Sequence, residues 1–143
     1  MRRIGTDNSD KEGNSRLPEV IVDFECEGDS LFIVIANVGF SSAHRISIRC
    51  DKEIRDFRGK QVTGMEVFRR LEFMPPGRKV RLFVNGFAAY LKEKQPLRPV
   101  FTVTYFDRDQ RKRTDVIRHN LAVFRGLVTS DETGKGNEPS FRK

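Results

Sequence analysis

The chain has 143 residues, of which 33% are charged and 37% hydrophobic, and its formal net charge is +7 at pH 7. A chain of this length predicts one domain that buries a core without disulfides or a metal. The longest apolar run, residues 31–38, is too short to cross a bilayer, and the first residues lack the apolar segment of a signal peptide. We therefore expect a cytoplasmic protein without a transmembrane segment.

Both ends of the sequence are polar. Residues 1–16 contain one large aliphatic residue besides the first methionine, and residues 129–143 contain one phenylalanine. Such segments bury too little apolar surface to offset the entropy lost on ordering. We therefore expect disordered tails at 1–16 and 129–143, around one domain at 17–128. The tails are nearly balanced in charge, so the excess positive charge belongs to the domain.

The first part of the chain predicts three strands. Residues 19–27 alternate between apolar and acidic side chains, which is typical of a strand with one solvated face. Residues 31–38 are apolar on both faces, which indicates a strand in the middle of a sheet. Residues 44–50 alternate again, with isoleucines expected inward and arginines outward.

The segment NVGFSSA, residues 37–43, separates the second strand from the third. In a sandwich the chain must cross between sheets about 10 Å apart, and we expect this segment to make that crossing. Gly39 is expected to adopt a positive φ, and Asn37 to bond local backbone. The two serines of the segment lie close to His44, but no motif supplies an oriented carboxylate, so we predict that Ser42 and His44 are not catalytic.

Residues 51–65 are polar and contain glycine, and they predict the longest irregular loop of the domain. Residues 66–74 are expected to form a strand that follows this loop. Its inward face would carry Val67, Leu71 and Phe73, because these three share one parity.

Pro76 and Gly77 predict a turn, because proline fixes φ and glycine supplies a positive φ. Residues 86–96 break the alternation, and the apolar spacing there predicts a short helical turn packed on the core. The remaining strands are expected at 78–85, 99–106 and 113–124.

About seven strands with frequent turn signals and one short helical turn predict an all-β fold, an antiparallel immunoglobulin-like β-sandwich. A small closed β-barrel is the alternative. The alternation predicts a core of Val22, Phe24, Ile33, Ile35, Ile46, Ile48, Leu82, Val84, Val103, Tyr105, Ile117 and Leu121.

Three stretches, IANVG, LEFMPPGRKVRLFV and VTYFDRDQRKRTDVIRHNL, together resemble the CARDB-type immunoglobulin-like domains of bacteria and archaea. In that family an N-x-G and a later L-x-P-G recur, and a tyrosine and an aspartate precede the last strand. The resemblance covers residues 31–124. It implies a non-enzymatic module, often extracellular or tethered to a membrane, although this sequence lacks an export signal.

The sequence contains no nucleophile elbow, P-loop or zinc-protease motif, so we predict no enzymatic activity and no cofactor. Asp107 and Asp109 have the spacing of calcium-loop carboxylates, but we expect residues 107–110 to be a hairpin turn without a metal. Cys26 and Cys50 are expected to be buried thiols, with a disulfide as the alternative.

Basic side chains cluster in two predicted loops. The candidate interaction surface consists of Arg55, Arg58, Lys60, Arg108, Arg111, Lys112 and Arg113. We expect it to bind another protein, because loops on a rigid sandwich commonly carry recognition. Nucleic acid or another anionic surface is the alternative partner, although no nucleic-acid-binding motif accompanies the charge. The sequence does not predict the partner's identity or the oligomeric state.

Overall fold

The computed structural model describes residues 16–126, so the predicted tails lie outside the described residues apart from Arg16. The strands are β1 (Val20–Glu27), β2 (Ser30–Asn37), β3 (Ala43–Cys50), β4 (Leu71–Met74), β5 (Lys79–Gly86), β6 (Val100–Phe106) and β7 (Lys112–Arg118). The helices are η1 (Val62–Gly64), α2 (Glu66–Arg69) and α3 (Phe87–Lys92). None of the helices in this part of the chain could span a membrane.

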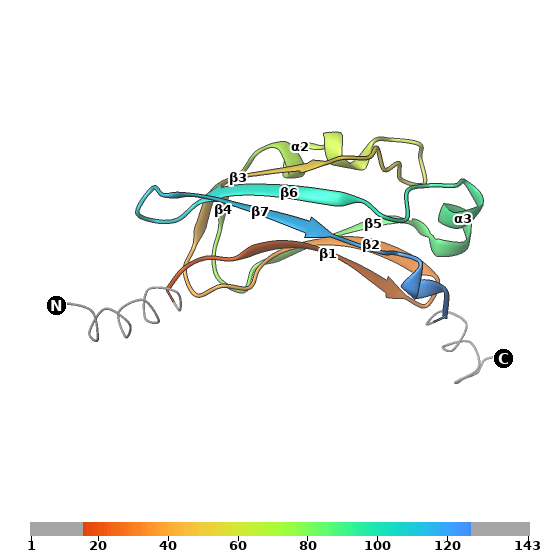
Figure 1. Cartoon of the computed structure of the whole chain (residues 1–143), viewed down its shortest axis with the longest axis horizontal. Helices are drawn as coiled ribbons and strands as arrows, with labels where there is room; N and C mark the ends of the chain where they lie inside the picture. Colours follow the sequence, from red (N-terminus) through yellow and green to blue (C-terminus); the bar gives the residue numbers. More distant parts are fainter. Residues whose placement is uncertain (1–15, 127–143) are drawn as a thin grey trace.

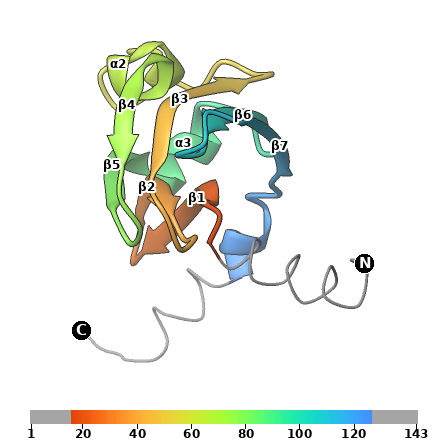
Figure 2. The same ribbon diagram turned by 90° about the vertical axis from the view of Figure 1, so that its left-hand side faces the viewer.

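The strands form two antiparallel sheets that face each other (Figure 1; Figure 2). Sheet A has the order β1-β2-β5, and sheet B has the order β4-β3-β6-β7. Each sheet has its own edges, so the fold is not a closed barrel. The predicted immunoglobulin-like β-sandwich is confirmed, with three strands packed against four.

Residues 37–43 do cross between the sheets, because β2 belongs to sheet A and β3 to sheet B. The register of sheet B fixes which loops share an end. His44 pairs with Phe106 at one end of β3, and Cys50 pairs with Phe101 at the other. The β6–β7 hairpin therefore lies at the opposite end of sheet B from the loop that follows Cys50, and Figure 1 shows the hairpin projecting at the left.

The core lies between the sheets. Of the twelve side chains predicted for it, Leu82 and Ile117 are only partly buried, and the others are buried. The alternation did not identify several large core side chains from loops and helices, namely Ile54, Val62, Phe68, Phe87 and Tyr90. The predicted helical turn is confirmed as α3, which supplies the last two of these.

The strand predicted at 66–74 is wrong in its first half, which forms α2. The helical turn places Phe68 in the core with 0% exposure, whereas a continuous strand with Val67 inward would have turned Phe68 outward. The remaining residues form the short β4, in which Met74 is buried and Phe73 is 51% exposed. Burying the Phe68 ring stabilises the helical turn more than a continuous strand with Val67 inward would be stabilised.

The last predicted strand, 113–124, ends earlier, at Arg118. Beyond it the His119 ring contacts the other sheet, because its Nε2 lies 2.8 Å from the carbonyl oxygen of Val22 in β1. The ring also packs edge-on against Phe24 and Phe101. Backbone bonding to the segment before β6 continues past Arg118, since the His119 N–H donates to Pro99 at 3.1 Å and the Leu121 N–H donates to Leu97 at 2.7 Å.

Cys26 and Cys50 lie in different sheets and are not joined by a disulfide. Both thiols pack against the core but are only partly buried, so the prediction of buried thiols holds in part. Burial is the main reason why the pKa of the Cys50 thiol is raised. Little of this thiol is therefore ionised at neutral pH.

Candidate interaction surface

Asn37 ties the two sheets together at the start of the crossing. Its side chain is fully buried, and its Nδ2 donates to the carbonyl oxygens of Ser41 and Met74, each at 2.9 Å. Its Oδ1 accepts from the backbone N–H of Glu19 at 3.2 Å and of Gly39 at 3.0 Å. The prediction that Asn37 bonds local backbone is confirmed, and the bonds reach β4 as well.

Gly39 has no positive φ, so the reason predicted for this glycine is wrong. Its requirement is space. A Cβ at this position would lie 2.5 Å from the carbonyl oxygen of Leu17 and 2.4 Å from the nitrogen of Glu19. The backbone on either side bonds the same segment, since Phe40 N–H donates to Leu17 and Val38 N–H donates to Glu19.

The turn at Pro76 and Gly77 is confirmed. Gly77 has φ +84°, and its N–H donates to the carbonyl oxygen of Asn37 at 2.8 Å. The Arg78 N–H donates to the carbonyl oxygen of Pro75 at 3.1 Å, which closes the turn. These four predicted turn residues, Asn37, Gly39, Pro76 and Gly77, thus belong to one structural unit at this end of the sandwich.

The crossing also brings Ser42 Oγ within 3.2 Å of His44 Nε2. Within residues 16–126 no carboxylate contacts the His44 ring, whose other close neighbour is Phe73, with ring centroids 5.4 Å apart. A serine needs an oriented base to become a nucleophile. The contact fits a structural hydrogen bond at the start of β3.

The β6–β7 hairpin is organised by Asp107. Its side chain is 2% exposed, and its Oδ1 accepts from the backbone N–H of Asp109 and of Arg111, each at 2.9 Å. The Gln110 N–H also donates to the Asp107 carbonyl oxygen at 2.9 Å. The predicted hairpin turn is confirmed, and it holds Arg108 and Arg111 exposed at its tip.

The loop after β3 neutralises its own arginines. Arg58 donates through two guanidinium nitrogens to Asp56, whose side chain is 1% exposed, and Arg55 pairs with Glu53. Burial alone would raise the pKa of Asp56, but hydrogen bonds from Arg58 and from backbone N–H groups outweigh it and lower that pKa. Lys60 is exposed and has no ion pair within the described residues. The charges of Arg55 and Arg58 therefore mainly stabilise the loop.

The hairpin differs from that loop in its charge balance. Arg108, Arg111 and Lys112 are exposed, and Arg113 is half-buried. None of the four forms an ion pair with another described residue. Because the two loops lie at opposite ends of sheet B, the structure separates the seven predicted site residues into two groups. Four bases lack an ion pair to a described residue in the hairpin group, against Lys60 alone in the other.

The outer face of sheet B continues the positive charge of the hairpin. On β3, β6 and β7 this face carries His44, Ser47, Arg49, Val100, Thr102, Thr104, Phe106, Lys112, Thr114, Val116 and Arg118. None of these side chains is acidic, and within the described residues Arg49 and Arg118 form no ion pair. We call this face, together with the 107–111 hairpin, the basic surface. Alternation in the sequence placed Arg49 on the outer face of its strand, but the predicted candidate surface did not include it. Arg118 was not singled out, although the alternation of β7 could have shown it.

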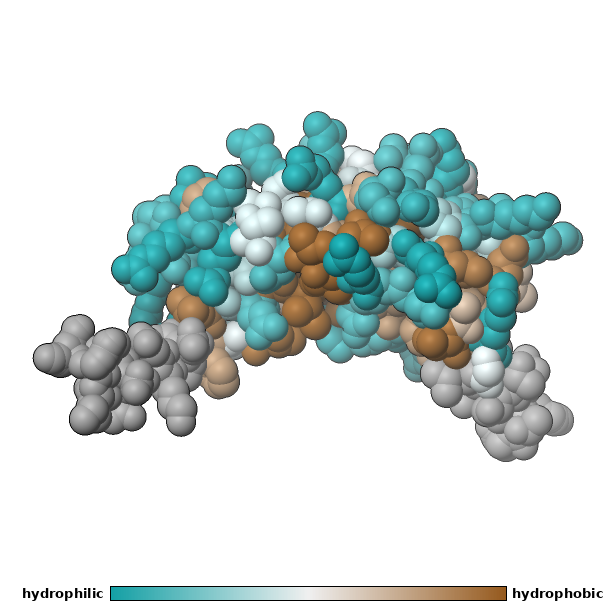
Figure 3. Space-filling view, in the orientation of Figure 1, coloured by the Kyte–Doolittle hydropathy of each residue, from teal (hydrophilic) through white to brown (hydrophobic). Residues whose placement is uncertain are grey.

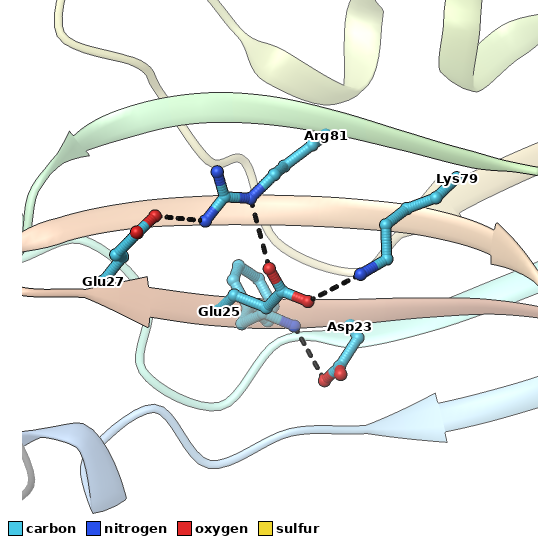
Figure 4. A network of polar contacts seen from close by, with 6 residues as sticks. Asp23, Glu25, Glu27, Lys79 and Arg81 are labelled. Atoms are coloured by element: carbon cyan, nitrogen blue, oxygen red, sulfur yellow. Dashed lines mark hydrogen bonds and ion pairs between the residues drawn. The ribbon is translucent and has the colours of Figure 1, made fainter.

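On the outer face of sheet A, the basic side chains of β5 form ion pairs with acidic side chains of β1. Figure 4 shows Glu25 between Lys79 and Arg81, with Arg81 also reaching Glu27. The Glu25 carboxylate lies 3.3 Å from the Lys79 ammonium nitrogen and 3.2 Å from the Arg81 guanidinium. The Glu27 carboxylate lies 2.8 Å from the same guanidinium. Val34 lies between Asp23 and Arg81 in the strand register and is 1% exposed, although its side chain lies on the outer face.

Exposed aromatic rings lie beside this network. Phe83 is 44% exposed and packs against Phe32 and Phe57, with centroid distances of 5.7 Å and 5.5 Å. The Arg81 guanidinium carbon lies 3.6 Å from the centre of the Phe32 ring. Arg81 and Phe83 share one face of β5 by alternation, but the acidic partners of Arg81 come from β1, which only the pairing of the strands brings near.

A family model described as a domain of unknown function (DUF8453) matches residues 3–125. No curated protein and no solved structure matches the chain. The matched residues include all seven strands, the crossing and the basic surface. The chain therefore belongs to the DUF8453 family of domains of unknown function.

Proposed function

We propose that this domain is a non-enzymatic binding module that holds an acidic segment of another protein against the basic surface. One observation carries the proposal, namely the uneven compensation of charge. Arginines in the 51–65 loop and on sheet A have acidic partners, whereas Arg49, Arg111, Lys112 and Arg118 have none within the described residues. Uncompensated charge on one face attracts a partner of opposite charge and orients it.

Two features favour a protein over single-stranded nucleic acid. Proteins that bind single-stranded nucleic acid combine positively charged side chains with exposed aromatic rings, on which the nucleobases stack. Here the exposed cluster of Phe57 and Phe83 lies with sheet A, and the exposed Phe73 of sheet B packs against His44 at the β4 edge, opposite β7. On the basic surface the Phe106 ring is covered by the Arg45 guanidinium, 3.9 Å from its centre. The centre of the surface is instead made of threonines, which suit hydrogen bonding to a polypeptide.

Binding of two polyanions to the purified protein tests the proposal. The probes are poly-L-glutamate and an oligo-dT strand of equal total charge, and the measurement is fluorescence anisotropy at low and moderate salt. We expect tighter binding of poly-L-glutamate. The double variant Arg111→Glu with Lys112→Glu should weaken that binding by about tenfold or more.

A matched control changes the same amount of charge elsewhere. Lys60→Glu with Lys92→Glu alters two exposed lysines without ion pairs to described residues and outside the basic surface. We expect it to weaken binding by less than about threefold, since long-range charge effects are screened by salt. Equal losses in the two double variants would contradict the proposed surface. Preference for oligo-dT, with a steep salt dependence, would identify nucleic acid as the partner class instead.

A further inference from the structure

Strand β7 is an edge of sheet B, and its seven residues are largely exposed. The hydrogen bonds at its two ends show which backbone groups point outward. The Asp107 N–H donates to the Arg111 carbonyl oxygen at 3.0 Å, and the His119 N–H donates to the Pro99 carbonyl oxygen at 3.1 Å. The β6–β7 register between these bonds is regular.

In an antiparallel ladder, every second residue directs both its N–H and its C=O to the partner strand. Because residues 111 and 119 bond β6, the odd-numbered residues of β7 do so as well. The even-numbered residues direct their backbone polar groups to the outer edge: Lys112, Thr114, Val116 and Arg118. Within residues 16–126, no hydrogen bond is made by these outward N–H and C=O groups.

The same four residues place their side chains on the basic surface. Val116 is 52% exposed, and Lys112 and Arg118 are exposed at the two ends of the strand. Figure 3 shows hydrophobic side chains gathered in the middle of the face that contains β7 and β1, with hydrophilic ones around them. The end-on view of Figure 2 shows β7 as the outermost strand of its sheet. The edge thus offers backbone groups, an apolar contact and two positive charges together.

From this arrangement we infer that the acidic segment binds in an extended conformation and adds a fifth strand to sheet B alongside β7. The inference rests on the proposed function and specifies how the partner is held. Main-chain hydrogen bonds to an exposed edge supply affinity in such complexes, and side chains at alternate positions supply specificity. Carboxylates opposite Lys112 and Arg118 would fall six positions apart in the partner, with apolar side chains at the second and fourth positions after the first carboxylate.

Charge makes a second copy of this chain the less suitable occupant. In a two-fold pairing that uses all four outward residues, Lys112 would lie opposite Arg118 of the other copy. Asp115 would then lie opposite its own equivalent. Like charges opposite each other across a ladder are destabilising, and charged edges are a common protection against self-association. An acidic partner instead places carboxylates opposite Lys112 and Arg118, so no like charges face each other at these two positions.

The test uses a synthetic peptide, fluorescein–Glu-Thr-Val-Thr-Val-Thr-Glu, in which both glutamates and both valines share one face of a strand. The control peptide, Thr-Glu-Val-Thr-Val-Glu-Thr, has the same composition but carries its glutamates on the other face. We expect the first peptide to bind the full chain about tenfold more tightly at low salt. Amide hydrogen exchange by NMR should show new protection at Lys112, Thr114, Val116 and Arg118, whereas Arg113, Asp115 and Ile117 are protected already.

Proline substitution separates backbone pairing from charge. Val116→Pro removes an outward N–H and leaves the β6–β7 bonds in place, so it should fold and lose about tenfold or more in affinity. Val116→Thr keeps the N–H and should bind within about twofold of the original protein. Thr114→Pro repeats the test at a second outward position, should Val116→Pro fail to fold.

The outcomes distinguish this inference from the proposed function. Retained peptide binding in a folded proline variant, with no new amide protection on β7, would overturn strand addition. If charge reversal at Arg111 and Lys112 still abolished binding in that case, the proposed function would hold, with the acidic segment bound by side chains and not by the backbone of β7. Insensitivity to both changes would overturn the proposed function as well.

Discussion

The side-chain amide of Asn37 donates a 2.9 Å hydrogen bond to the carbonyl oxygen of Met74 and thereby joins sheet A to sheet B. Both residues are fully buried. The contact lies beneath the crossing and the Pro76–Gly77 turn, so one side chain determines the backbone positions at this end of the sandwich.

Replacing Asn37 by aspartate tests the role of its donors. A carboxylate keeps the acceptor for Glu19 and Gly39 but cannot donate to Ser41 or Met74. Leaving two buried carbonyls without donors should lower the free energy of unfolding by about 2–5 kcal/mol, which urea denaturation would measure. Asn120→Asp is the control, because Asn120 Oδ1 only accepts, from the Ala122 N–H. Equal free energies of unfolding for the two variants would show that the hydrogen bonds donated by Asn37 do not stabilise the contact between the sheets.

Gly39 should tolerate no Cβ. Gly39→Ala places a methyl group against the backbone of Leu17 and Glu19 and should separate β1 from the crossing, at a cost of about 1–3 kcal/mol. Gly64→Ala is the matched control, because the nearest atom to its added Cβ lies 3.7 Å away. Thermal melts of both variants give the comparison. A Gly39→Ala protein as stable as the control would show that the close approach is not required.

The strand alternation was sufficient to predict the sandwich and most of its core, because each strand has one face toward the other sheet. It failed where a single buried ring decided the conformation, as with Phe68 in α2. It also gave the wrong reason for Gly39, since the approach of Leu17 depends on a contact between segments far apart in the chain.

For the site, the sequence identified the hairpin bases but grouped them with Arg55 and Arg58. Only the fold shows that Asp56 neutralises Arg58 inside its own loop, and that Glu25 reaches across to Arg81. Charge counts along a sequence do not distinguish paired from unpaired bases, because pairing depends on strand order.

The two tyrosines predict a pH dependence at the alkaline end. Burial, with the neighbouring Asp115, raises the pKa of Tyr105 from 10.0 to about 12, and burial also raises the pKa of Tyr90. The unfolded chain ionises its tyrosines near the ordinary value, so it binds fewer protons than the folded protein between about pH 10 and pH 12. The free energy of unfolding should therefore be insensitive to these groups below pH 10 and fall as pH rises through that window.

Tyrosinate absorbance measures this directly. In the native protein it should appear at higher pH than in the urea-unfolded chain, and Tyr105→Phe should remove part of the alkaline loss of stability. Coincident titrations of the folded and unfolded protein would contradict the burial of the two hydroxyl groups, of which that of Tyr105 donates to Asp115 at 2.9 Å.

NMR mapping of poly-L-glutamate binding on the isotope-labelled protein tests the central claim most directly. Amide shift changes should concentrate on β7, on the outward-facing residues of β3 and β6, and on the hairpin that carries Arg108 and Arg111. The amide shifts of sheet A and of the 51–65 loop, where Arg81 and Arg58 have acidic partners, should change little. Shift changes centred on the 51–65 loop or on sheet A, with β7 and the hairpin unaffected, would contradict the account.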